Sequence, residues 1–192
     1  MKKRKIIAVS ALVGFSCLVH AQSAFQKGTT LIKAGIGIGS SILNYSGSSQ
    51  TPAISAQFEK GIWEIGGPGV ISLGGYVGTK SYKYHYSSSY YDYTAKWNYT
   101  IIGVRSAYHY TGLKNGKADL YGGLMLSYNH LKYKFEDKNG GTSGSYGFGS
   151  YGSGTGITAY VGGNYFFANN IGAFAELGYG VSYLTLGLTI KL

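Results

Sequence analysis

The C-terminal stretch Ser182-Tyr-Leu-Thr-Leu-Gly-Leu-Thr-Ile-Lys-Leu192 decides the fold. Every second residue of this stretch is aliphatic, and the residues in between are polar, aromatic or glycine. This alternation predicts a β-strand with one apolar and one polar face, because successive side chains of a strand point to opposite sides. The aliphatic face consists of Leu184, Leu186, Leu188, Ile190 and Leu192.

The same alternation occurs near the start of the domain. Ile32, Ala34, Ile36 and Ile38 share one parity, while Lys33 and glycines occupy the other. Both ends of the domain are therefore predicted to be amphipathic strands. In lipid neither strand can keep an unpaired edge, so we expect the first and last strands to pair and close a barrel.

Six further alternating segments lie between these two, at residues 53–61, 69–83, 96–110, 118–134, 156–167 and 171–179. The connections between them alternate in length. Those at 40–52, 84–95 and 136–155 are long and polar, whereas those at 64–68, 111–117 and 168–170 are short and rich in turn formers. The last link, around Gly180, is also short, although its place in the alternation is on the side of the long loops. Short periplasmic turns and longer outer loops are typical of bacterial membrane barrels. We predict an all-β fold, a closed antiparallel up-and-down transmembrane β-barrel of about eight strands.

The apolar face of this barrel is predicted to face lipid. A soluble β-fold, the alternative, would bury its apolar face instead. The polar face is crowded with glycine, which suits the interior of a narrow eight-stranded barrel that side chains already fill. Tyrosines stand at strand ends on the apolar face, as aromatic girdles at the membrane interfaces require. These are Tyr108, Tyr110, Tyr128, Tyr165 and Tyr179.

Residues 1–21 have the layout of a secretory signal peptide. Cations at positions 2–5 precede the apolar run 6–19, and Val19-His20-Ala21 offers small residues at −3 and −1. We predict cleavage after Ala21, which leaves an outer-membrane barrel domain over residues 22–192. The apolar run is shorter than the roughly 20 residues of a membrane-spanning helix. A retained anchor, or a lipoprotein modified at Cys17, is the weaker alternative.

The composition excludes several classes of function. Loss of the signal peptide removes the one cysteine and lowers the net charge from +10 to +6. The remaining charge is scattered rather than gathered in the basic stripe typical of nucleic-acid binding, so no nucleic-acid partner is expected. No histidine pair stands at metal-ligand spacing. The glycine run 35–39 alternates as a strand and opens no helix, unlike a dinucleotide fingerprint. We expect the protein to bind no cofactor. We expect outer-membrane lipid to surround the barrel.

Charges of both signs occur on the face predicted to line the lumen. The cations are Lys33, Arg105 and Lys191, and the acids are Glu59, Asp119 and Glu176. Ionised groups in a confined interior persist only when they are paired or hydrated. We therefore predict a salt-bridged plug centred on Glu59, Arg105 and Glu176, which would exclude a wide pore.

Enzymatic activity is not expected. His109 shares the polar face with Arg105 and could in principle act as a general base. No serine or acidic residue stands at a spacing that would argue for a catalytic triad with it. A polar histidine of the lumen or the interface is the preferred interpretation.

The outer loops are the favoured place for function. They combine tyrosine with serine and glycine, a composition typical of adaptable recognition surfaces. The candidate residues are Tyr84, Tyr86, Tyr90, Tyr91, Tyr146, Phe148 and Tyr151. The hypothesis is adhesion or contact with an extracellular ligand of unknown identity. Flexible, solvated loops without a partner are an equal alternative.

Several strands resemble the small outer-membrane β-barrel family of Gram-negative bacteria, which includes porin-like and OmpA-type membrane domains. The resemblance covers nearly the whole mature chain and is carried by residues 58–62, 69–78, 103–110, 119–126 and 173–192. It implies an eight-stranded barrel without catalytic residues, and a last strand that the barrel-assembly machinery reads. Chains of this family usually end in phenylalanine, whereas this one ends in Leu192. The difference implies weaker or altered recognition, although the apolar alternation that the machinery needs is intact.

Three functions stay open at this point. A structural or surface-interaction barrel is favoured. A narrow porin-like channel for small solutes is the second, and a barrel enzyme that acts on membrane lipid is the third.

Overall fold

The computed structural model of the protein describes residues 23–40, 48–88, 92–113, 115–137 and 153–192, and the backbone of 144–146. The signal peptide predicted for residues 1–21 lies outside these ranges, so its cleavage stays a prediction. Among the described residues, no helix has the length and apolar character needed to cross a membrane.

The structure consists almost entirely of antiparallel strands. The long ones are β1 (Thr30–Ile38), β3 (Ala53–Ile65), β4 (Gly69–Ser87), β5 (Asp92–Tyr110), β6 (Ala118–Asp137), β8 (Gly154–Phe166), β9 (Ile171–Tyr179) and β10 (Leu184–Lys191). Two short strands, β2 (Ser49–Gln50) and β7 (Gly144–Tyr146), pair with β4 and β6. The 3-10 turn η1 (Thr111–Leu113) links β5 to β6.

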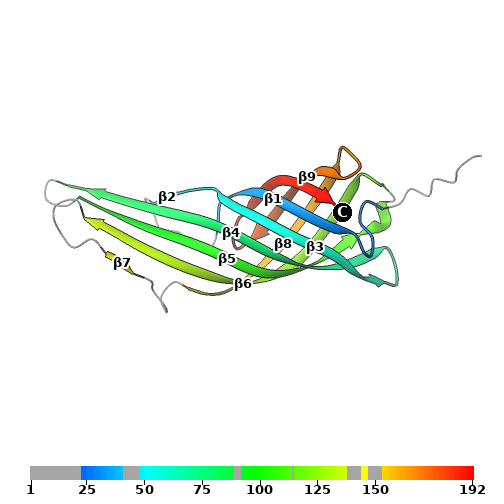
Figure 1. Cartoon of the computed structure of the whole chain (residues 1–192), viewed down its shortest axis with the longest axis horizontal. Coiled ribbons are helices and arrows are strands. Elements are labelled where there is room, and N and C mark those ends of the chain that lie inside the picture. The colour runs from blue at the N-terminus through cyan, green and yellow to red at the C-terminus, as the bar shows by residue number, and fades with distance from the viewer. Residues whose placement is uncertain (1–22, 41–47, 89–91, 114, 138–143, 147–152) are drawn as a thin grey trace, which may run out of the picture.

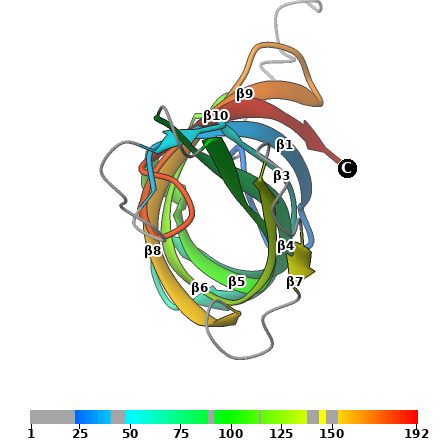
Figure 2. The same cartoon turned by 90° about the vertical axis from the view of Figure 1, so that its left-hand side faces the viewer.

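The sheet closes on itself. Each long strand pairs with the long strands next to it in sequence, and β1 pairs with β10 from Leu31–Lys191 to Ile38–Leu184. Figure 2 shows the resulting ring. The predicted closed barrel of eight antiparallel strands is confirmed. We call the end that carries the short turns the periplasmic end, following the rule for bacterial barrels, and the opposite end the outer end.

The two faces of the barrel are inverted relative to a soluble protein. Ile157 and Ile102 point outward and are 72% and 63% exposed, whereas Arg105 points inward and is 1% exposed. Aliphatic side chains from every long strand share this outward orientation. An outward apolar band around a closed barrel is typical of barrels that lie in lipid, so the barrel spans a membrane.

Aromatic side chains mark both edges of the apolar belt. Trp63, Tyr108 and Tyr165 are exposed near the periplasmic end, and Tyr128 and Tyr179 are exposed near the outer end. Such girdles form where amphipathic rings meet the headgroup layer. They delimit the part of each strand that lies in the hydrocarbon.

Glycines on the lumen face make room for large side chains. A Cβ atom at Gly35 would lie 2.8 Å from the Phe174 ring, and one at Gly162 would lie 2.7 Å from both the Ala175 carbonyl oxygen and the Tyr121 hydroxyl. A narrow barrel can hold tyrosine, phenylalanine and arginine side chains only if the residues beside them are small. This explains the glycine-rich face seen in the sequence.

Strands β4, β5 and β6 extend well beyond the other strands at the outer end (Figure 1). The predicted long loop 84–95 is therefore wrong in part, because strand pairing continues through Tyr84–Ala95 and Tyr86–Tyr93. The loop predicted over 136–155 likewise contains the end of β6, all of β7 and the start of β8. We name the extension, residues 79–87, 92–100 and 129–137, the outer arm.

Candidate functional site

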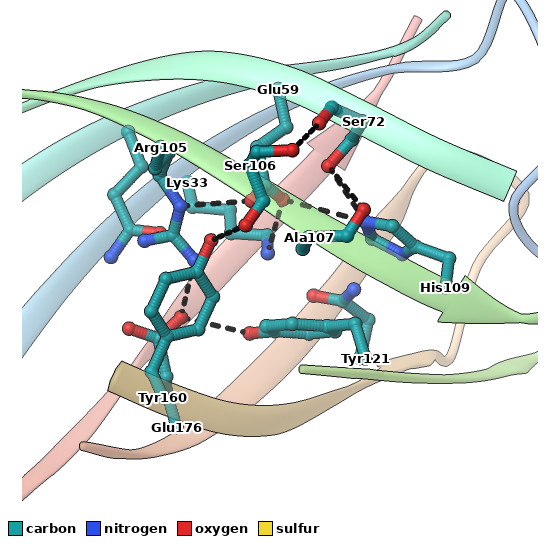
Figure 3. Close-up of polar contacts among 12 residues, drawn as sticks. Lys33, Glu59, Ser72, Arg105, Ser106, Ala107, His109, Tyr121, Tyr160 and Glu176 are labelled. Carbon is teal, nitrogen blue, oxygen red and sulfur yellow. Dashed lines mark hydrogen bonds and ion pairs between the residues drawn. The ribbon is translucent and has the colours of Figure 1, made fainter. Parts of the chain in front are cut away.

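The centre of the lumen is a buried ion cluster around Arg105 (Figure 3). The Arg105 guanidinium, from β5, donates through Nε to Glu59 Oε1 at 2.8 Å and through Nη2 to Glu176 Oε2 at 2.7 Å. Its Nη1 donates to Gln57 Oε1 at 2.7 Å. One side chain thus ties β5 to β3 and to β9 across the interior of the barrel.

Lys33 completes the charge balance of this cluster. Its Nζ, from β1, donates to Glu59 Oε2 at 2.9 Å and lies 4.0 Å from the centroid of the Tyr121 ring. The cluster therefore contains two cations and two carboxylates. Buried ions are tolerable when they are paired and hydrogen-bonded in this way, and removal of one partner is costly.

Two tyrosines enclose the cluster. The Tyr160 ring lies 4.0 Å from Arg105 Cζ, and its hydroxyl donates to the Ser106 carbonyl oxygen at 3.1 Å. The Tyr121 hydroxyl donates to Glu176 Oε2 at 3.2 Å. Each ring covers a cation with its face, a favourable arrangement in a desolvated site.

A second polar cluster lies on the periplasmic side. His109 Nδ1 lies 2.9 Å from Asp119 Oδ2, and His109 Nε2 lies 3.2 Å from Ser72 Oγ. Asn164 Nδ2 also donates to Asp119 Oδ2, at 2.7 Å. The sequence did not indicate this serine–histidine–aspartate arrangement, because its members come from three different strands and meet only through the register of β4, β5 and β6.

The arrangement resembles a hydrolase triad in residue types, but a substrate cannot reach it in this structure. Ser72 and His109 are 0% exposed and Asp119 is 2% exposed. The Phe25 ring stacks on the His109 ring at a centroid distance of 3.6 Å and covers it. The cluster acts here as a buried hydrogen-bond chain that satisfies polar groups of the lumen.

The lumen is closed by apolar layers on both sides of the polar clusters. On the periplasmic side, residues 23–29 fold into the barrel mouth, where Phe25 packs with Ala24, Leu31, Val70 and Phe166. The outer layer is larger. It contains Tyr76, Tyr82, Tyr99, Ile101, Met125, Leu131 and Val181. Side chains therefore fill the described lumen, apart from a small pocket beside Arg105 and Glu176 that Val181 and Ser182 also line.

The structure brings together four of the six charged residues predicted for the lumen network. Lys33, Glu59, Arg105 and Glu176 form one cluster. Asp119 belongs to the neighbouring histidine cluster.

Lys191 meets none of the predicted acids and lies over the Phe166 ring, 4.7 Å from its centroid. The expectation that it pairs with an acid is wrong because Leu31 stands between Lys191 and Glu59 in the register of β10, β1 and β3.

The outer arm has an aromatic inner face. Tyr93 stacks on Tyr86 at 5.4 Å and packs on Phe135 at 5.4 Å, and Trp97 packs on Tyr133 at 5.5 Å. Burial, with a smaller contribution from the neighbouring Tyr93, raises the pKa of Tyr133. Inside the membrane the inward side of these strands is polar. In the outer arm the inward side is aromatic, so the polar and apolar faces exchange sides where the strands leave the lipid.

Two of the predicted recognition residues, Tyr84 and Tyr86, lie on this inner face, within strand β4 rather than in a loop. Tyr146 lies in β7, and its side chain is outside the described residues. Tyr90, Tyr91, Phe148 and Tyr151 are also outside them.

The outer face of the arm is polar and cationic. Neighbouring strands place Lys83 opposite Lys96, and Lys96 opposite Lys134. In the adjacent row towards the membrane, Asn98 lies between Ser81 and Lys132. These lysines are far apart in sequence, so only the strand register could have revealed the row. Within the described ranges, no three histidine, cysteine, aspartate or glutamate side chains form a group that could hold a metal ion.

The architecture is that of a small outer-membrane β-barrel. No protein-family model matches the sequence, and no curated protein does. Solved structures of small barrels are similar in fold but distant in sequence.

One such structure is Ail, the attachment invasion locus protein of Yersinia pestis, in complex with the heparin analogue sucrose octasulfate. It shares 14% identity at a TM-score of 0.47, and the alignment covers 86% of this chain and 96% of that chain. The N-terminal β-barrel domain of Pseudomonas aeruginosa OprF shares 13% identity at a TM-score of 0.48, covering 86% and 98%. Neisserial surface protein A shares 16% identity at a TM-score of 0.39, covering 85% and 96%. Likeness at this level carries no inference about a ligand.

Proposed function

We propose that this protein is a structural and surface-interaction barrel, in which a permanently filled lumen anchors the outer arm that makes the contacts. One observation carries the proposal: the reversal of the two faces of β4, β5 and β6 beyond the lipid. Tyr84, Tyr86 and Trp97 turn inward there, while Lys83, Lys96 and Lys134 turn outward. A three-stranded sheet with aromatic side chains on one face is a rigid platform, and tyrosine supplies contact area at a low entropic cost.

Attachment of cells tests this role. A non-adherent bacterial host that displays the barrel should bind to host cells or matrix, and the triple variant Y84S/Y86S/Y93S should bind less. The matched control is the triple variant Y108S/Y110S/Y165S, which removes tyrosines from the periplasmic end. Heat-modifiable gel mobility confirms that each variant is folded. Equal attachment by the arm variant and the wild-type protein would rule out the inner face as the contact surface.

The narrow channel is the second candidate, and the filled lumen argues against it. Phe25, Arg105 and Ile101, one residue from each layer of the lumen, are each at most 1% exposed. Purified protein in planar bilayers should show no steady conductance. Steady single-channel currents would contradict the structural role and support a channel for small solutes.

We also propose that the barrel is not an enzyme. Ser72, His109 and Asp119 face the closed lumen rather than the lipid, which supports this proposal. The lipid profile of cells should be unchanged by expression of the wild-type protein and of the variant S72A. A lipid product present with the wild-type protein but absent with S72A would contradict the proposal.

Export and assembly are proposed to follow the pattern indicated by the sequence. Cleavage after Ala21 would begin the mature chain at Gln22, three residues before Phe25, which packs in the barrel mouth. Leu186, Leu188, Ile190 and Leu192 are exposed on the outside of the last strand, where the assembly machinery could read them. Mass spectrometry of the membrane-extracted protein tests the cleavage site. A double variant L186S/L188S, with slower conversion to the heat-modifiable form, tests the recognition.

A further inference from the structure

Three lysines form a row across the outer face of the arm. Lys83, Lys96 and Lys134 occupy directly opposite positions on β4, β5 and β6. Cβ atoms of directly opposite residues lie about 5 Å apart, and like charges at that spacing destabilise a sheet. Lys132 adds a fourth cation one row nearer to the membrane. The row therefore costs free energy unless an anion lies over it.

The chain does not supply enough negative charge to neutralise this row. All seven acidic residues of the sequence belong to the described part. Glu136 Oε1 lies 3.4 Å from Lys96 Nζ, and its side chain is 51% exposed. Among the described residues, this is the ion pair recorded for the row. Glu59, Asp119 and Glu176 are buried in the lumen, and Glu64 lies at the periplasmic end. Asp92 Oδ1 lies 3.7 Å from His85 Nδ1, and Asp137, opposite Tyr93, is on the inner face of the arm.

The row continues the lipid-facing surface of the barrel. Lys83 has the same outward parity as Val77 on β4, and Lys96 has the same parity as Ile102 on β5. The six-residue spacing corresponds to about 20 Å along a strand, or about 15 Å along the membrane normal for a typical strand tilt. A phospholipid headgroup layer is only about 5–8 Å thick. Lysine side chains that reach down towards the membrane would meet anionic groups carried above that layer.

We propose that Lys83, Lys96 and Lys134 bind phosphate groups on the sugar headgroup of a glycolipid in the leaflet around the barrel. The occupant is a lipid because the row lies on the lipid-facing side of the strands. A phosphorylated glycolipid fits the row because the lysines require negative charge. Its sugar headgroup also carries phosphate groups above the phospholipid headgroup layer, where the lysines lie. This site uses the outer face of the arm, so it does not depend on adhesion through the aromatic inner face.

Binding of a defined glycolipid tests the proposal. The mature protein in zwitterionic micelles is titrated with lipopolysaccharide that carries phosphorylated inner-core sugars, and with the same material after dephosphorylation. Trp97 is next to Lys96 in sequence and is one of two tryptophans. In a W63F background its fluorescence is therefore a single local signal.

We expect phosphate-dependent binding, and a rise in the dissociation constant of about fivefold for each lysine removed. The triple variant K83Q/K96Q/K134Q should thus lose on the order of 100-fold in affinity. The matched control K27Q/K60Q/K117Q removes three exposed lysines from the periplasmic end and should bind like the wild-type protein. The variant K83R/K96R/K134R keeps the charge and should retain binding.

A second readout guards against misfolded variants. Without glycolipid, removal of the opposed charges should raise the unfolding temperature of K83Q/K96Q/K134Q above that of the wild-type protein. Equal affinity of that variant and the wild-type protein would overturn the proposal, and so would equal binding of the dephosphorylated material. If a soluble sulfated polysaccharide bound through the row while the glycolipid did not, the occupant would be a polysaccharide and the lipid assignment would be wrong.

Discussion

Arg105 on β5 and Glu176 on β9 are joined across the lumen by a hydrogen-bonded ion pair of 2.7 Å between Nη2 and Oε2. Both side chains are buried, and Arg105 also holds Glu59. The ion pair thus joins β5 and β9, two strands that are not neighbours in the sheet.

Loss of the Arg105 charge should destabilise the barrel. Arg105→Ala leaves Glu59 and Glu176 buried, with Lys33 as their nearby cation. We expect a loss of about 3–5 kcal/mol in the free energy of unfolding, the usual cost of an uncompensated buried charge. Urea unfolding in lipid vesicles, followed by tryptophan fluorescence, measures it. Lys60→Ala, at an exposed position, should change the value by less than about 0.5 kcal/mol. A similar small loss for R105A would show that the cluster contributes little.

The apolar layer around Phe25 at the periplasmic mouth should be dispensable for closure of the lumen. Phe25→Ala removes the ring that covers His109, yet the Arg105 cluster and the layer around Ile101 remain. We expect F25A to stay without conductance in planar bilayers, and to release the backbone amides near His109 to faster hydrogen exchange. Opening of a conducting pathway in F25A would mean that the inner layers do not seal the lumen.

Gly162 should tolerate no side chain. In Gly162→Ala the new methyl group would meet the Ala175 carbonyl oxygen and the Tyr121 hydroxyl, each at 2.7 Å. Overpacking of this kind costs about 1–3 kcal/mol. Gly75→Ala is the matched control, since its Cβ would meet nothing nearer than the Gly103 carbonyl oxygen at 3.9 Å. The prediction fails if the two variants unfold at the same urea concentration.

Tyr93 should hold the outer arm together. Its ring contacts Tyr84, Tyr86 and Phe135, and each such aromatic pair contributes about 0.5–1.5 kcal/mol. Tyr93→Ala should therefore accelerate amide hydrogen exchange in the arm and leave the barrel strands protected. Thr100→Ala, on the outer face of the same strand, serves as the comparison. Faster exchange throughout the barrel would show that the arm and the barrel unfold as one unit.

The barrel itself was predictable because its signal is local. Alternation within single segments placed Arg105 in the lumen and Ile102 in lipid, and both positions are confirmed. The lengths of β4 and β5 were not predicted. Their alternation continues beyond the membrane with the apolar side turned inward, so tyrosine-rich strand segments such as 84–87 resembled a polar loop.

The details of the site depended on contacts between strands. Ser72, His109 and Asp119 meet only once the register of β4, β5 and β6 is known, and the lysine row has the same origin. The covering role of Phe25 had no sequence signal, since it rests on a short segment that folds back into the barrel mouth. Periodicity assigns a face to a side chain but does not identify its neighbours across the barrel.

The pairing of β1 with β10 has a consequence for biogenesis. These strands lie at opposite ends of the domain, so the bonds that seal the ring have the largest sequence separation in the fold, and contacts of that kind form slowly. Until they form, two strand edges stay open and can pair with other chains. Ring closure should therefore be the slow step of insertion, and a chain stopped before Leu184 should be captured by proteases or aggregate rather than accumulate in the membrane.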